Sequence, residues 1–149
     1  MPRFLHTVLL LFATLAVTAQ DFTIEALDGR LLRVDSVVAE RPTLLLFFDP
    51  DCTECRQELF AMRCSFLLRQ HVADSTLQVV CVYVGTNDSL WRETARQQPN
   101  TWTMAICRKE TDVPSLYDLS SLPVLYLMDT QKHIVQQAYE LRDIRFRKE

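Results

Sequence analysis

The fold of this chain is decided by the stretch Phe47-Phe48-Asp49-Pro50-Asp51-Cys52-Thr53-Glu54-Cys55-Arg56-Gln57-Glu58, in which two cysteines are separated by two residues. An apolar run typical of a buried strand ends there and a helical pattern begins, with Asp51 as the expected cap of the helix. A helix N-terminus carries unpaired N–H groups and a partial positive charge, which favour the thiolate, the nucleophile of disulfide exchange. We therefore interpret Cys52 as an attacking thiol, and Cys55 as the thiol that resolves a mixed disulfide formed at Cys52.

The length and composition are those of one globular domain, since the 149 residues are 48% hydrophobic and include two glycines. We expect residues 1–19 to be a signal peptide, because a basic start and a short apolar run end in small residues before Gln20. Residues 20–149 would then form the domain. We expect this domain to be located in the periplasm of a bacterial cell envelope or to be secreted. The run is too short to span a membrane comfortably, so contact with a membrane is expected only through an uncleaved signal.

The mildly acidic net charge of −3 argues against nucleic-acid binding. An odd number of cysteines, five, does not indicate a small domain stapled by disulfides. Cys64 and Cys81 are expected to be buried small hydrophobes. Cys107 borders the polar run Arg108-Lys109-Glu110, and it is either a regulatory thiol or a tolerated one.

The order of the expected elements predicts an α/β fold in which strands and helices alternate. The elements are a hairpin at 22–34 turning at Asp28-Gly29, strand 43–48, long helix 52–71, strand 77–84, helix 88–98, strand 101–107, short helix 113–119, antiparallel strands 124–129 and 133–139, and a short charged helix within 140–149. This order predicts a central mixed β-sheet flanked by helices, with an N-terminal β-hairpin.

From about Phe22 to Tyr139 the chain resembles the thioredoxin superfamily, specifically its exported TlpA-like thiol-disulfide oxidoreductases. The hairpin, the cysteine pair, Glu58 and the segment Leu116-Tyr117-Asp118-Leu119-Ser120-Ser121-Leu122-Pro123 before an apolar strand carry this resemblance. The thioredoxin-like fold implies that Pro123, preceded by Leu122, is a cis-proline that faces the dithiol and holds the substrate backbone. It also implies that Glu58 is a buried carboxylate that exchanges a proton with Cys55; the alternative is a solvated helix carboxylate.

The sequence departs from that family in its acidic residues Asp49, Asp51 and Glu54 around Cys52. Like charges oppose ionisation of the Cys52 thiol, and a less stabilised thiolate favours the oxidised form of the couple. We therefore expect a reductant rather than a strong oxidant. The same carboxylates are alternatively solvated caps, or they select basic partners.

The sequence thus predicts an enzyme that reduces protein disulfides through a Cys52/Cys55 dithiol. No cofactor beyond this dithiol and no metal are expected. The expected partners are disulfide-containing protein substrates and an upstream redox protein, and the chain is expected to be a monomer. Two alternatives stay open: a non-catalytic binding module with the same fold, and a dithiol that handles copper or another metal, although no histidine lies near the pair.

Overall fold

The computed structural model describes residues 20–146, so the signal peptide expected over residues 1–19 lies outside the described residues, as do residues 147–149. Seven strands form one sheet in the order β2-β1-β5-β4-β3-β6-β7. They are β1 (Thr23–Ala26), β2 (Leu31–Arg33), β3 (Thr43–Phe48), β4 (Gln78–Val84), β5 (Thr103–Cys107), β6 (Val124–Met128) and β7 (Ile134–Ala138). Strands β3, β4 and β5 are parallel and the other pairings are antiparallel. The predicted mixed sheet is confirmed.

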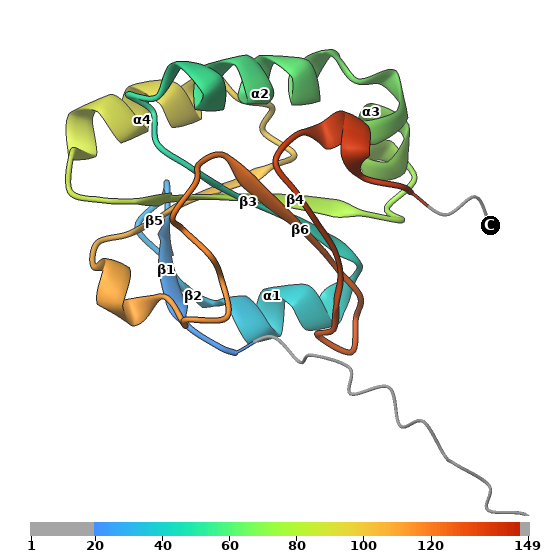
Figure 1. Cartoon of the computed structure of the whole chain (residues 1–149), viewed down its shortest axis with the longest axis horizontal. Helices are drawn as coiled ribbons and strands as arrows, with labels where there is room; N and C mark the ends of the chain where they lie inside the picture. Colours follow the sequence, from blue (N-terminus) through green and yellow to red (C-terminus); the bar gives the residue numbers. More distant parts are fainter. Residues whose placement is uncertain (1–19, 147–149) are drawn as a thin grey trace, which may run out of the picture.

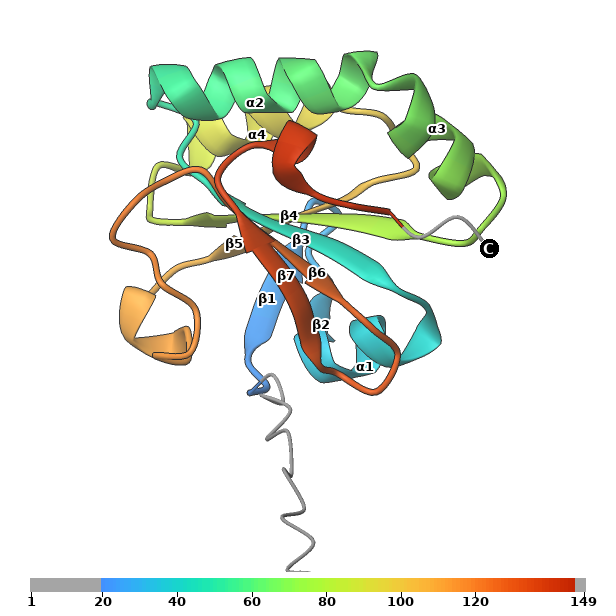
Figure 2. The same ribbon diagram turned by 45° about the vertical axis from the view of Figure 1, so that its right-hand side comes forward.

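Helices cover both faces of this sheet, which gives the molecule three layers (Figure 1). The helices are α1 (Val34–Glu40), α2 (Thr53–Cys64), α3 (Phe66–Ala73) and α4 (Asp88–Arg96), with 3₁₀ turns η1 (Glu110–Asp112) and η2 (Leu141–Asp143). Helices α2, α3 and α4 lie on one face, and α1 lies on the other together with the segment that contains η1 (Figures 1 and 2). The C-terminal turn η2 lies on the same face as α2 and α3.

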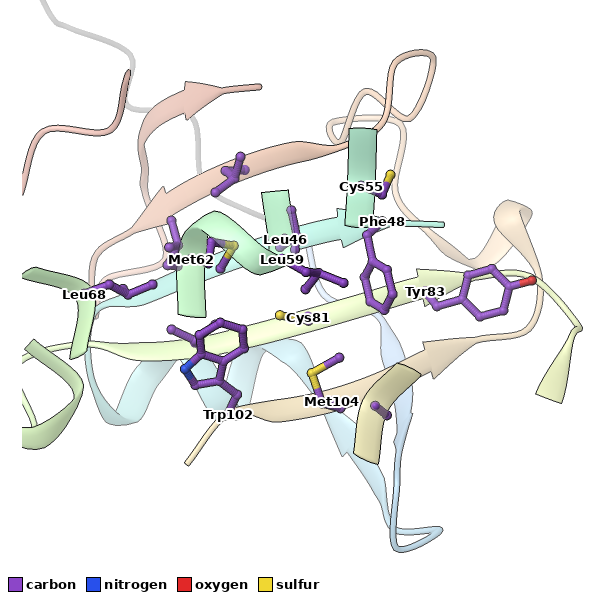
Figure 3. Close-up of a cluster of buried hydrophobic side chains, with 14 of the residues drawn as sticks. Leu46, Phe48, Cys55, Leu59, Met62, Leu68, Cys81, Tyr83, Trp102 and Met104 are labelled. Carbon is purple, nitrogen blue, oxygen red and sulfur yellow. The ribbon is translucent and has the colours of Figure 1, made fainter. Parts of the chain in front are cut away.

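Strand β3 is the centre of the core, because all six of its residues are buried. Leu44, Leu46 and Phe48 pack with residues of α2, α3 and α4 on one face. Figure 3 shows Leu46 and Phe48 in this cluster. Leu45 and Phe47 pack on the opposite face. Successive side chains of a strand point to opposite faces, so a strand that is covered on both sides has a continuous apolar run.

The N-terminal hairpin has the predicted form. Its strands pair antiparallel, with Thr23 opposite Arg33. Gly29 has a φ of +85°, which residues with a side chain rarely adopt. Strand β1 then pairs with β5, so the hairpin extends one edge of the sheet.

The prediction of a single long helix from Cys52 to about His71 is wrong, because the helix is interrupted at Ser65. This residue is extended (φ −68°, ψ 113°), and its hydroxyl accepts a hydrogen bond from the backbone N–H of Leu68, which begins α3. The change of direction leaves Phe66 66% exposed. It also leaves Cys64 at the exposed end of α2, so the prediction of a buried Cys64 is wrong. Cys81, in contrast, is buried as predicted.

The short helix expected over residues 113–119 is also wrong, since this segment forms turns. The backbone N–H of Asp118 donates to the Tyr126 hydroxyl at 2.8 Å, and the Asp118 side chain accepts from the Ser120 N–H. The first bond ties the segment to β6, and the second forms a local turn where a helix would have its ladder of backbone hydrogen bonds. The charged helix expected within residues 140–149 is reduced, in the described part, to the three-residue turn η2.

Candidate active site

Cys52 is the N-cap residue of α2. Its sulfur accepts a hydrogen bond from the backbone N–H of Cys55 at 3.3 Å, the role that a capping side chain plays. Asp51, the predicted cap, is instead exposed, and its own N–H donates to the Asp49 carboxylate at 2.8 Å. The sulfur of Cys52 therefore occupies the positive end of the helix, where negative charge is stabilised.

Cys55 lies one turn further in and is fully buried. Burial raises the pKa of its thiol to about 12; the neighbouring Cys52 adds to this increase, and the N–H of Asp49, 3.4 Å from the Cys55 sulfur, opposes it. A thiol with so high a pKa is protonated at neutral pH. This thiol therefore needs a proton acceptor before it can act as a nucleophile.

The loop before β6 lies beside Cys52, although it is distant in sequence. The peptide bond between Leu122 and Pro123 is cis, as the resemblance implies. The carbonyl oxygen of Leu122 lies 3.9 Å from the Cys52 sulfur, across 70 residues of sequence. Antiparallel pairing of β3 with β6, in which Phe47 is opposite Val124, brings the two segments together.

Glu58 is one of two buried polar side chains of the described residues, with 7% of its surface exposed. The alternative of a solvated carboxylate is therefore wrong. Burial raises the pKa of the Glu58 carboxyl, while the backbone N–H of Leu141, which donates to Oε1 at 2.6 Å, opposes the increase. Glu58 follows Cys55 by three residues, so the two side chains lie on the same buried face of α2.

The acidic residues around Cys52 differ in their contacts. The thiol of Cys52 donates to Glu54 Oε2 at 3.4 Å, and this bond, after one from the backbone of Glu54 itself, lowers the pKa of Glu54. The Asp49 carboxylate accepts a hydrogen bond from the backbone N–H of Asp51. Asp51 is exposed. Of the three carboxylates, Glu54 is thus the one in contact with the Cys52 sulfur.

The contacts of Leu141 with Glu58 and of Asp49 with Cys55 were missed by sequence reasoning. Both come from backbone N–H groups, which every residue except proline carries, so the residue types contain no signal for them. Within residues 20–146, no three histidine, cysteine or acidic side chains gather in the way that metal ligands do. Over the same residues, no helix has both the length and the apolar composition needed to span a membrane.

Several solved structures of similar fold come from Bacteroides. A conserved Bacteroides fragilis protein of unknown function has a TM-score of 0.74 at 28% identity, covering 85% of this chain and 92% of its own. The thioredoxin domain of a Bacteroides vulgatus thiol-disulfide oxidoreductase has a TM-score of 0.71 at 20% identity, covering 86% and 90%. A thiol:disulfide interchange protein from Bacteroides sp. has a TM-score of 0.69 at 18% identity, covering 82% and 79%. No family model and no curated protein matches the sequence.

Proposed function

Because its fold is similar to that of thioredoxin-like proteins, we propose that this chain is a thiol-disulfide oxidoreductase of the thioredoxin superfamily, which reduces protein disulfides through Cys52 and Cys55. One observation carries this proposal: the Cys52 sulfur caps α2 and faces the Leu122 carbonyl, while the Cys55 thiol lies buried behind it. A structural disulfide between residues three apart would close a very short loop and would stabilise the fold little. Redox exchange makes better use of this pair.

The proposed reaction has two displacement steps. The Cys52 thiolate attacks one sulfur of a substrate disulfide, so that a Cys52–substrate disulfide forms and the other substrate sulfur leaves as a thiolate. Cys55, after losing its proton, attacks the Cys52 sulfur. The Cys52–Cys55 disulfide forms, the mixed disulfide breaks, and the second substrate sulfur leaves as a thiolate that takes up a proton. The substrate gains two electrons and the dithiol loses two.

Glu58 is the proposed acceptor of the Cys55 proton. It lies on the same buried face of α2 as Cys55, and a carboxylate in a poorly solvated place is a stronger base than an exposed one. The proton can then be returned to the departing substrate thiolate. This role would make the release of substrate depend on the ionisation of Glu58.

Leu122 and Pro123 are proposed to hold the backbone of the substrate beside the nucleophile. The position of the Leu122 carbonyl next to the Cys52 sulfur supports this role. An upstream redox protein would return electrons to the Cys52–Cys55 disulfide, and the dithiol itself would be the only redox group. The signal peptide expected over residues 1–19 would direct the chain to the cell envelope, where disulfide substrates occur.

Trapping of mixed disulfides tests the proposal. In a Cys64→Ser background, which removes the exposed third thiol, Cys55→Ser should accumulate covalent complexes with disulfide-bonded proteins such as insulin. Non-reducing electrophoresis should show these complexes, reductant should release them, and mass spectrometry should locate them at Cys52. The matched control is the Cys52→Ser/Cys55→Ser double variant, which should form none. A folded Cys55→Ser variant that traps no partner would contradict the proposal and favour a non-catalytic binding module.

The contact between Glu54 and Cys52 gives a further prediction. Glu54→Gln removes the negative charge beside the thiol and leaves a neutral amide oxygen, a weaker acceptor, so more Cys52 thiolate should be present. Alkylation of Cys52 by iodoacetamide at neutral pH should become about two- to fivefold faster, a small effect because the pair is exposed. Peptide mass spectrometry measures the rate at Cys52 separately from that at Cys64.

The control for this prediction is Glu93→Gln, which removes an exposed carboxylate from α4. It should leave the alkylation rate of Cys52 unchanged. The difference caused by Glu54→Gln should shrink in 1 M salt, in which the screening length falls to about 3 Å. An unchanged or slower rate in Glu54→Gln at low salt would show that this carboxylate does not restrain the Cys52 thiol.

A further inference from the structure

The C-terminal segment that follows β7 is fixed to the rest of the molecule at several points. Ile144 is buried in the same cluster as Leu59 and Met62 of α2. The side chain of Gln136 exchanges two hydrogen bonds with the backbone of Arg145, at 2.7 and 2.8 Å. The Phe146 ring lies 5.2 Å from the ring of His71 in α3. Residues 140–146 are thereby held against helices α2 and α3 and against β7 (Figure 2).

This segment reaches the candidate active site through one backbone group. The N–H of Leu141 donates to Glu58 Oε1 at 2.6 Å. Leu141 is the first residue of η2, and the two backbone hydrogen bonds of this turn use the N–H groups of Asp143 and Ile144. The Leu141 N–H is therefore not used by the hydrogen bonds of the turn itself, and it donates to the Glu58 carboxylate instead.

We propose that the C-terminal turn, residues 140–146, is a positioning element of the redox site, which holds the Glu58 carboxylate through the Leu141 N–H on the buried face of α2 that also carries Cys55. The inference rests on the proposed function, because it assigns the turn a part in the proton transfer from Cys55. The turn has two opposite effects on the ionisation of Glu58. Covering Glu58 disfavours the ionised carboxylate, and donating a hydrogen bond to it favours that form.

The charged groups that face Glu58 belong to the same turn. The carboxylates of Glu140 and Asp143 raise the pKa of Glu58, and the guanidinium of Arg142 lowers it. All three side chains are exposed, so they can be exchanged without disturbing the core. The turn thus contains both the hydrogen bond and the charges that adjust the basicity of Glu58.

Two substitutions at Leu141 distinguish the contribution of its N–H from that of its side chain. Leu141→Pro removes the N–H, and the backbone accommodates proline, since Leu141 is at the first position of the turn and Glu140 is extended (φ −139°, ψ 143°). Leu141→Ala keeps the N–H and shortens the side chain. The two variants share the loss of leucine packing. They differ at the backbone nitrogen, where proline replaces the donating hydrogen by a ring carbon that faces Glu58.

The readout is the pH profile of the resolving step, in a Cys64→Ser background. A thionitrobenzoate mixed disulfide is formed at Cys52, and release of the coloured thiolate by Cys55 is followed by stopped-flow absorbance. For Leu141→Pro, we expect release at pH 7 to be about tenfold slower and to recover at alkaline pH, because the carboxylate has lost a strong hydrogen bond. Leu141→Ala should keep the pH midpoint of the unmodified chain.

Surface charges of the turn provide a second, independent test that does not depend on proline. Glu140→Gln should move the pH midpoint of release downward, and Arg142→Gln should move it upward. In a Glu58→Gln background, none of these substitutions should move the midpoint. ¹³C NMR titration of the Glu58 carboxyl carbon should show the same directions.

The outcomes distinguish this inference from the proposed function. Equal pH profiles for Leu141→Pro and Leu141→Ala, or shifts that persist in the Glu58→Gln background, would overturn the role of the turn. The proposed function would survive that result, because release by Cys55 would still be observed. Failure of the unmodified dithiol to release thionitrobenzoate would instead refute the resolving role of Cys55.

Discussion

Disulfide reduction should disappear when Cys52 is replaced by serine. A serine hydroxyl cannot form the mixed disulfide on which both displacement steps depend, so the rate of dithiothreitol-driven insulin reduction should fall to background. Removal of a covalent nucleophile typically costs about a thousandfold or more. The rate of insulin precipitation measures the effect.

The serine substitution is informative because it preserves the structural role of Cys52. The Cys52 sulfur caps α2 by accepting from the Cys55 N–H, and serine is a favoured N-cap residue that can accept the same bond. Cys52→Ser should therefore keep the stability of the unmodified chain, whereas Cys52→Ala should lose about 1 kcal/mol in urea unfolding. Cys64→Ser is a control that should retain activity. Full activity in Cys52→Ser would rule out Cys52 as the nucleophile.

Glu58→Gln should have opposite effects on activity and on stability. Without a carboxylate, the Cys55 proton has no nearby acceptor, so the resolving step should slow by about a hundredfold at neutral pH. The glutamine oxygen can still accept the Leu141 N–H, and the buried charge is gone. The variant should therefore unfold at a higher urea concentration than the unmodified chain at neutral pH.

The pH dependence of this stability difference follows from the direction of the pKa shift. The fold raises the pKa of Glu58 above the ordinary value of 4.5, so its stabilising contribution is full below pH 4.5 and is lost as the pH rises through the folded-state pKa. Glutamine does not titrate. The free energy of unfolding of Glu58→Gln should therefore increase, relative to that of the unmodified chain, as the pH rises. The increase should be about 1.4 kcal/mol for each unit by which the fold raises the pKa of Glu58.

Urea unfolding at a series of pH values measures this gain, and Glu93→Gln on α4 is the exposed control that should show none. A stability difference that is constant with pH, together with unchanged release of thionitrobenzoate, would show that Glu58 is not the proton acceptor. Loss of activity without the pH-dependent gain would also argue against a buried, titrating carboxylate.

Sequence reasoning predicted the elements whose signal is carried by residue type. The continuous apolar run of β3 predicted a strand covered on both faces, and Gly29 predicted the hairpin turn. It placed Cys52 and Cys55 at the start of a helix and Pro123 at the entrance to β6. These features depend on local patterns of apolar residues, glycine and proline, which the amino-acid sequence displays directly.

The features that it did not predict depend on tertiary contacts or on backbone groups. The break at Ser65 has no proline or glycine to indicate it, and it depends on a serine hydroxyl that serves as a cap. Cys52 rather than Asp51 caps α2, because the choice between neighbouring acceptors is made by the path of the backbone. The contact of Leu141 with Glu58 joins residues 83 apart through an N–H group. The substrate, the redox partner and the signal peptide stay predictions.

The position of β3 between β4 and β6 has a consequence for how the chain folds. Strand β4 pairs with β3 after the two helices α2 and α3, but β6 must close a much longer loop to reach the other side of β3. Long-range pairing of this kind pays a larger loop-closure entropy and slows folding. During synthesis the two cysteines emerge about 70 residues before the Leu122 carbonyl that faces them. The nascent chain thus carries reactive thiols before it has the sheet that orients them.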